Sequence, residues 1–226
     1  METKRIPLAE SMLFLTVVTF MGGFLDTYIY TVRNGFFPNG HTTNMAKVGI
    51  ALAQGNWNSL FQTLMFPIAF VLGVIVSEIV RTVVKDRDWR SIGLLLEFLL
   101  LCGVAFVPDW VPDQTINCFG CFITAYQLCL FRKCEFGVHN TTICTGNLRS
   151  VGQFFFSALQ DKSASSWMRF LKYGSFIVTF VLGSAASSLL CGVMGRFASL
   201  VGAVIVAGLY VSMILDEKKM AASATA

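Results

Sequence analysis

Charged residues are scarce in this chain: Asp, Glu, Lys and Arg together make up 13% of its 226 residues, whereas 55% are hydrophobic. A soluble domain of this length cannot bury so large an apolar fraction, and the mean hydropathy of +0.66 agrees with that conclusion. Strict alternation of apolar and polar residues is also absent, which argues against a transmembrane barrel. The composition therefore predicts an all-α, polytopic membrane protein embedded in a lipid bilayer.

The chain also lacks the short motifs of several enzyme classes. It has no H-E-x-x-H helix, no G-x-S-x-G elbow and no phosphate-binding loop of the G-x-x-x-x-G-K-[ST] type. We therefore expect neither enzyme activity nor ATP-driven transport by this chain alone. The net charge of +4 does not indicate a nucleic-acid partner, because the basic residues fall in short loops between apolar segments.

Histidine is rare as well, which limits any metal site. Cys118 and Cys121 have the C-x-x-C spacing of thiol-exchange and metal sites, but a zinc site needs two further ligands. The two histidines, His41 and His139, are expected on opposite faces of the membrane. Because cysteine also behaves as a small apolar residue in helices, we expect no metal and no cofactor.

Eight apolar segments remain, and their lengths fall into two groups. Six approach the ~20 residues that a membrane span needs. Two are shorter, and at 1.5 Å per residue they reach only about 20 Å of the ~30 Å hydrocarbon core, so they need not cross it. The long segments are residues 11–32, 59–80, 92–107, 114–131, 173–194 and 197–215, and the short ones are residues 42–54 and 145–159.

The distribution of basic residues favours short segments that enter the membrane and return. With a cytoplasmic N-terminus, 13 of the 17 basic residues then lie inside, Arg33 and Arg196 lie outside, and Lys47 and Arg149 belong to the short segments. If all eight segments crossed, seven would lie inside and eight outside, against the positive-inside rule. The 13 inside residues are Lys4, Arg5, Arg81, Lys85, Arg87, Arg90, Arg132, Lys133, Lys162, Arg169, Lys172, Lys218 and Lys219.

Three crossings in each half would give the two halves opposite orientations. The sequence thus predicts six full transmembrane helices and two re-entrant half-helices in a 3+3 inverted repeat. The first repeat is residues 1–110 and the second is residues 111–226, divided at the proline-rich loop 108–113. We expect a multi-pass protein of the cell membrane with both termini in the cytoplasm.

A sequence motif is duplicated at the start of the two short segments. Thr42-Thr43-Asn44 is followed by Val48-Gly49, and Thr145-Gly146-Asn147 is followed by Val151-Gly152. Repeats in membrane transporters meet at a substrate site near the bilayer midplane, where helices are interrupted. The duplication therefore predicts a site formed by both motifs.

These residues also resemble a known family. Gly22-Gly23-Phe24-Leu25-Asp26, a Thr-Gly-Asn-like element and a late Cys-Thr-Gly-Asn-Leu-Arg are similar to the YoaK-type bacterial membrane proteins, an uncharacterised family. The resemblance covers nearly the whole chain and implies a polytopic membrane protein suspected of transport. The first element departs from the pattern, because Thr43 stands where glycine is expected, and threonine is less free to adopt a positive φ.

The repeated motif suggests a binding chemistry. Thr or Asn at the start of a helix can cap one free N–H group, while the remaining groups and the positive end of the helix dipole would face the midplane. Two such ends would attract an anion or a polar solute, and Lys47 and Arg149 would add positive charge. The alternative is that Thr and Asn only cap two buried helices, while Lys47 and Arg149 pair with acids or lie nearer the surface.

Two further residues complete the predicted substrate site. Asp26 is a carboxylate within a span, where a charge is costly and therefore suggests function. It would carry a coupling proton or act as a fixed partner for Lys47 or Arg149. Tyr126 would line the cavity. The predicted site is thus Asp26, Thr42, Thr43, Asn44, Lys47, Tyr126, Thr145, Gly146, Asn147 and Arg149.

From these features we expect a secondary-active transporter for a small anionic or polar solute, coupled to protons. The plan is similar to that of the larger sulfate and uracil permeases, which also place two half-helix N-termini opposite one another. The alternatives are a channel-like pore and a non-transporting membrane scaffold. The small size of the chain and its faces of small residues permit a homodimer.

Overall fold

A computed structural model describes residues 7–84, 89–108, 110–134 and 137–224, and in these residues the chain is mostly helical. This confirms the all-α prediction. The α-helices are α1 (Met12–Val32), α2 (His41–Ala53), α3 (Trp57–Val83), α4 (Trp89–Ala105), α5 (Asp113–Leu130), α6 (Cys144–Asp161), α7 (Ala164–Met194) and α8 (Ala198–Ala224). Two 3₁₀ turns, η1 (Leu8–Glu10) and η2 (Gly195–Phe197), and a two-stranded antiparallel sheet of β1 (Lys133–Cys134) and β2 (Gly137–Val138) complete the fold.

The helices follow the apolar segments of the sequence, with two extensions. Helix α7 begins nine residues before residue 173, because Ser163 caps it by accepting a hydrogen bond from the N–H of Ser166. Helix α8 continues through the charged residues after 215. A helix can continue beyond its apolar residues, so the hydrophobic run alone predicted neither the start of α7 nor the end of α8. The short β1–β2 hairpin was not predicted.

Three helical stretches among the described residues are long and apolar enough to cross a membrane: Met12–Val32, Trp57–Val83 and Ala164–Met220. The third contains two helices, since α7 ends at Gly195, whose φ of 54° is in the left-handed region. These stretches support the interpretation as a membrane protein. Four of the predicted cytoplasmic basic residues, Lys4, Arg5, Lys85 and Arg87, lie outside the described residues, as does Asp109 of the predicted dividing loop.

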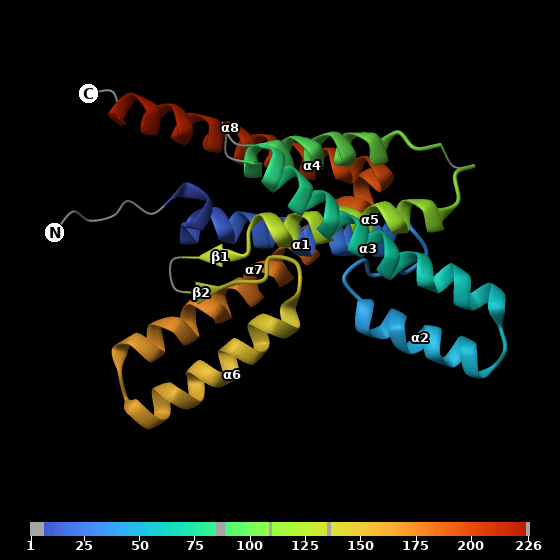
Figure 1. The fold of residues 1–226 in the computed structure, drawn as a ribbon, viewed down its shortest axis with the longest axis horizontal. Coiled ribbons are helices and arrows are strands. Elements are labelled where there is room, and N and C mark those ends of the chain that lie inside the picture. Colours follow the sequence, from blue (N-terminus) through green and yellow to red (C-terminus); the bar gives the residue numbers. More distant parts are fainter. Residues whose placement is uncertain (1–6, 85–88, 109, 135–136, 225–226) are drawn as a thin grey trace.

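The helices pack in a pattern that relates the two halves of the chain. Helix α1 packs along α7, and α5 packs along α3. Each short helix forms a hairpin with the long helix that follows it, α2 with α3 and α6 with α7, while α4 lies beside α8. In Figure 1 the two hairpins extend toward opposite ends of the molecule, and the start of α1 lies at the same end as the end of α8.

Glycines allow the closest of these crossings. A Cβ atom on Gly23 of α1 would collide with the backbone carbonyl oxygen of Phe180 in α7, and one on Gly183 of α7 would collide with that of Phe20 in α1. The two helices therefore approach each other backbone to backbone, which only residues without a side chain permit.

The core is centred on α1, and the outer helices turn apolar faces outward. Leu15, Val18 and Met21 of α1 are fully buried. By contrast, α3 and α7 expose large apolar side chains, including Val71 and Leu182, each more than half exposed. A surface of this kind suits contact with lipid rather than water.

Candidate functional site

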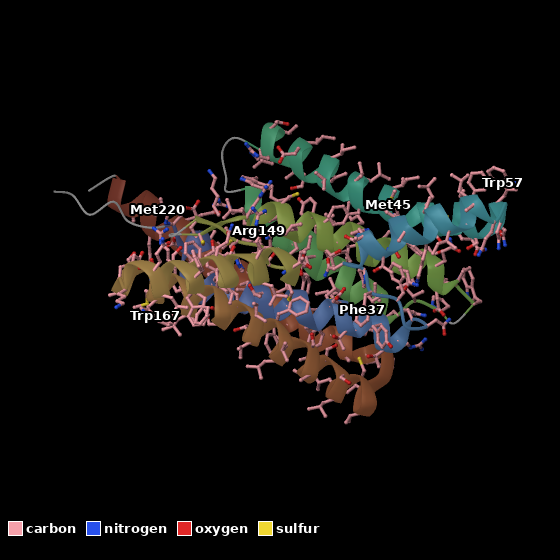
Figure 2. The ribbon with its side chains drawn as sticks, turned by 90° about the horizontal axis from the view of Figure 1, so that it is seen from below. Phe37, Met45, Trp57, Arg149, Trp167 and Met220 are labelled. Carbon is pink, nitrogen blue, oxygen red and sulfur yellow. The ribbon has the colours of Figure 1, made fainter. Side chains whose placement is uncertain are left out.

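Helices α2 and α6 begin in the interior of the molecule. Figure 1 shows both N-terminal ends toward the middle, with α2 and α6 running from there to opposite ends. In Figure 2, Met45 and Arg149, near the starts of α2 and α6, lie nearer the middle than Trp57 and Trp167, which lie at or near the starts of the helices after them.

The asparagine of each repeated motif occupies the same helical position. Asn44 is the fourth residue of α2 and Asn147 is the fourth residue of α6. Both are buried, with 4% and 2% of their surface exposed. The duplication seen in the sequence therefore places two asparagines at equivalent points of two interior helix ends.

The capping role expected for these motifs is wrong. The N-cap residues are Gly40 for α2 and Ile143 for α6, and neither helix has a side-chain cap. Thr42, Thr43 and Thr145 lie inside the first turns and are exposed. The sequence placed both helix starts one residue too late, because a Thr or Asn near a helix start resembles a cap whether or not it acts as one.

Asn147 instead holds the loop before α6. Its side-chain nitrogen donates to the carbonyl oxygen of Asn140 at 2.7 Å, and its side-chain oxygen accepts from the N–H of Asn140 at 3.3 Å. Gly146 is half-buried beside this pair, and a Cβ there would collide with the Asn140 side chain. Neither Gly146 nor Thr43 has a positive φ, so both copies of the motif share helical geometry despite the departure at Thr43.

Helix α1 contacts the loops before both short helices. The carboxylate of Asp26 accepts a hydrogen bond of 3.1 Å from the backbone N–H of Asn39, two residues before α2. Cys121 of α5 donates to the carbonyl oxygen of Pro38, the residue before Asn39, at 3.6 Å. Gly22, one turn before Asp26, approaches the backbone of Thr141 and Thr142 in the loop before α6.

Several buried polar atoms around these helix starts have no hydrogen-bond partner. They belong to the side chains of His41 and Asn44 in α2 and of Thr141 and Thr142 before α6. Thr141 and Thr142 lie directly against α1, because the backbone of Gly22 approaches both of them. Unpaired buried donors and acceptors are rare in folded proteins, since each costs free energy, and their concentration here favours a bound polar ligand or water.

A model of one protein family matches most of the chain. The family model described as "Protein of unknown function (DUF1275)" matches residues 14–213. The chain belongs to this family. The match runs from α1 into α8 and includes both short helices, in agreement with the YoaK-type resemblance of the sequence. No curated protein and no solved structure matches the sequence.

In this DUF1275 chain both histidines pack against aromatic rings of neighbouring helices. His139 stacks on Phe176 with ring centroids 3.7 Å apart, and its Nε2 atom lies 2.8 Å from the hydroxyl of Thr19. His41 packs on Phe70 of α3 with a centroid distance of 4.2 Å. Sequence reasoning missed them as site residues. The available signal was that each is a lone histidine shortly before, or at the start of, a short apolar helix.

The remaining predicted residues are Lys47, Arg149 and Tyr126. Lys47 and Arg149 are exposed, and neither forms an ion pair with Asp26, so the fixed-partner interpretation of Asp26 is wrong in this conformation. Tyr126 of α5 is buried, with its hydroxyl unpartnered among the described residues. The structure thus joins Asp26 to the loop before α2 and Asn147 to the loop before α6, and leaves the predicted cations at the surface.

Proposed function

We propose that this protein is a secondary-active transporter whose small polar or anionic solute binds between the N-terminal ends of α2 and α6. The observation that carries the proposal is the group of unpartnered buried polar atoms on His41, Asn44, Thr141 and Thr142. A binding pocket holds a few convergent polar groups in an apolar wall, and these four residues supply them between two interior helix ends.

The packing of the helices supports an inverted repeat. If α1 corresponds to α5 and α3 to α7, the contacts between α1 and α7 match those between α5 and α3. The hairpins α2–α3 and α6–α7 then correspond, and the contact of α4 with α8 joins the two halves. Such a pair of halves permits alternating access, because rocking one against the other opens the shared site to either side.

Two tryptophans support re-entrant short helices. Trp57 begins α3 and Trp167 lies near the start of α7, and Figure 2 places them toward opposite ends of the molecule. Tryptophan is enriched at both membrane interfaces. If the turns after α2 and α6 lie at opposite interfaces, each short helix runs from the midplane back to the side from which its chain entered.

The charges of the proposed site limit the class of solute that it can bind. The helix ends present partial positive charge, whereas Asp26 of α1 presents a carboxyl group to the loop before α2. An anion would bind best with a proton on Asp26, and a neutral solute with both donors and acceptors would bind in either state. Both cases fit proton-coupled transport of a small solute.

The test is a thermal-shift screen of the purified full-length protein against small anions, nucleobases and amino acids at two pH values. We expect at least one compound to raise the unfolding temperature of the wild type but not that of Asn44→Ala. Asn58→Ala is the matched control, because Asn58 is exposed and contacts only Gln62 in the first turns of α3. It should keep the shift.

Compounds that stabilise the wild type but not Asn44→Ala are then tested for uptake into proteoliposomes. Saturable uptake driven by a proton gradient is the expected result, whereas flux that does not saturate would indicate a channel. A screen without stabilising compounds, or with shifts that survive in Asn44→Ala, would contradict the proposed site and favour a scaffold.

A further inference from the structure

Glu97 is a buried acid that the proposed solute site does not use. It lies in the middle of α4 with 2% of its surface exposed, and its Oε1 atom has no hydrogen-bond partner. No ion pair among the described residues includes it. Glu78 and Glu10 differ from it, because Glu78 pairs with Arg81 and Glu10 pairs with Arg90, each at 3.2 Å.

The surroundings of Glu97 are apolar. On its own helix, Leu94, Leu101 and Val104 share its buried face, at spacings of three, four and seven residues. Helix α8 packs beside α4 and contributes buried Val206 and Leu209 to the same core. An unpaired carboxylate in such a place would cost several kcal/mol, so the neutral acid is the form that these contacts accommodate.

Among the described residues no cation pairs with Glu97: Arg81 of α3, which also packs against α4, pairs with Glu78, and Arg90 of α4 pairs with Glu10. Helix α5 contributes Tyr126 together with Cys118, Cys121 and Cys129, and α8 contributes Tyr210. The rings of Phe106 and Phe197 are in contact, so the end of α4 lies against the start of α8. The two helices are therefore antiparallel, and the charged end of α8 lies beyond the first turns of α4, away from Glu97. That end carries Asp216, Glu217, Lys218 and Lys219. Arg196 lies at the opposite end, donating to the carbonyl oxygen of Val107.

From this geometry we propose that Glu97 is an exchangeable proton-binding site at the α4–α8 contact, neutral in the conformation described here. The proton comes from water and returns to water when the contact between the halves opens; no other bond forms or breaks. Tyr126 is the nearest candidate relay, because its ring approaches Gly93, one turn before Glu97, and its hydroxyl is buried without a partner. That this proton drives solute movement rests on the proposed function, but the proton site itself does not.

Infrared spectroscopy of the full-length protein in lipid tests the site without any solute. At neutral pH the difference between wild type and Glu97→Gln should contain a carboxylic acid C=O band above the amide I region. In D₂O that band should shift to lower frequency as the acid proton exchanges. Glu78→Gln is the matched control, since it removes an exposed, ion-paired carboxylate and should leave the acid band intact. Asp26→Asn should also leave it intact, which separates this site from the solute site.

Two results would overturn the proposal. The first is loss of a carboxylate band rather than an acid band in Glu97→Gln, which would show that Glu97 is ionised. The second is an acid band that does not shift after prolonged incubation in D₂O, which would show a sealed structural acid. If Glu97→Gln does not fold, wild type labelled with ¹³C-carboxyl glutamate tests the same proposal. An acid band from a glutamate shifts in frequency with the label, and its further shift in D₂O can then be measured directly.

Discussion

The side-chain amide of Asn147 closes on the backbone of Asn140 with two hydrogen bonds, whereas the amide nitrogen of Asn44, at the equivalent position of the other short helix, is buried without a partner. Two residues that the sequence presents as copies therefore have different roles. Asn147 fixes the loop before α6, and Asn44 is available to a ligand. This asymmetry gives the first prediction.

Asn147→Ala should destabilise the protein more than Asn44→Ala does in the absence of ligand. Removing the Asn147 amide takes two hydrogen bonds from the partly buried N–H and carbonyl groups of Asn140, at a cost of about 1–3 kcal/mol. Asn44→Ala removes an amide nitrogen that has no partner and should cost less. Thermal unfolding of both purified variants measures the difference. Equal losses would mean that Asn44 also has a structural partner.

Gly183→Ala should disrupt the crossing of α1 and α7. The added methyl group meets the backbone carbonyl of Phe20, which cannot move as a flexible side chain would, so we expect a loss of at least about 1–3 kcal/mol. Gly208→Ala in α8 is the matched control, because nothing lies within 4 Å of its added Cβ and alanine favours the helix by up to about 1 kcal/mol. Unfolding temperature and monodispersity by size-exclusion chromatography report both effects. A Gly183 variant as stable as wild type would contradict the close approach.

Asp161 should make the α6–α7 turn sensitive to acid. The backbone N–H of Ser163, at 2.8 Å, and the hydroxyl of Ser166, at 2.7 Å, donate to its carboxylate and hold the pKa of Asp161 below its ordinary value. A lowered folded-state pKa stabilises the protein fully above the unfolded-state pKa of about 3.9, and the contribution is lost as the pH falls through the folded-state value.

Asp161→Asn should therefore unfold at a lower temperature than wild type near neutral pH, and the two curves should converge below about pH 4. Unfolding temperatures measured across this pH range provide the test. Ser166→Ala is the companion variant, and in combination with Asp161→Asn it should add little, because both remove the same hydrogen bond. A difference that persists at low pH would show that the asparagine acts through something other than charge.

Arg33 and Asp113 should be energetically coupled across the ends of α1 and α5. The guanidinium lies 3.2 Å from the carboxylate, and the Arg33 side chain is only 7% exposed. In a double-mutant cycle with Arg33→Met and Asp113→Asn we expect a coupling of about 1 kcal/mol or more. The Arg81–Glu78 pair has the same separation but is more than half exposed on both sides, and it should give only about 0.3–0.5 kcal/mol. Similar values for the two pairs would show that burial does not strengthen the first.

The sequence alone determined the class of protein and most of its helices. The scarcity of charge, the length of the apolar segments and the two short segments are local properties, and a helix forms wherever such a run permits it. The equivalence of Asn44 and Asn147 was also visible, because it depends only on spacing along the chain. The β1–β2 hairpin and the polar first turns of α7 were not predicted, because they have no hydrophobic periodicity.

Tertiary structure alone decided what these residues contact. That Asp26 accepts a hydrogen bond from Asn39, that Gly22 approaches Thr141, and that Glu97 has no partner all follow from how helices far apart in sequence cross. A local pattern gives the face of a helix on which a residue lies, but not the neighbour that the face meets. For the same reason the sequence took Thr and Asn as caps and Lys47 as a site residue, whereas packing buried the asparagines and left the lysine at the surface.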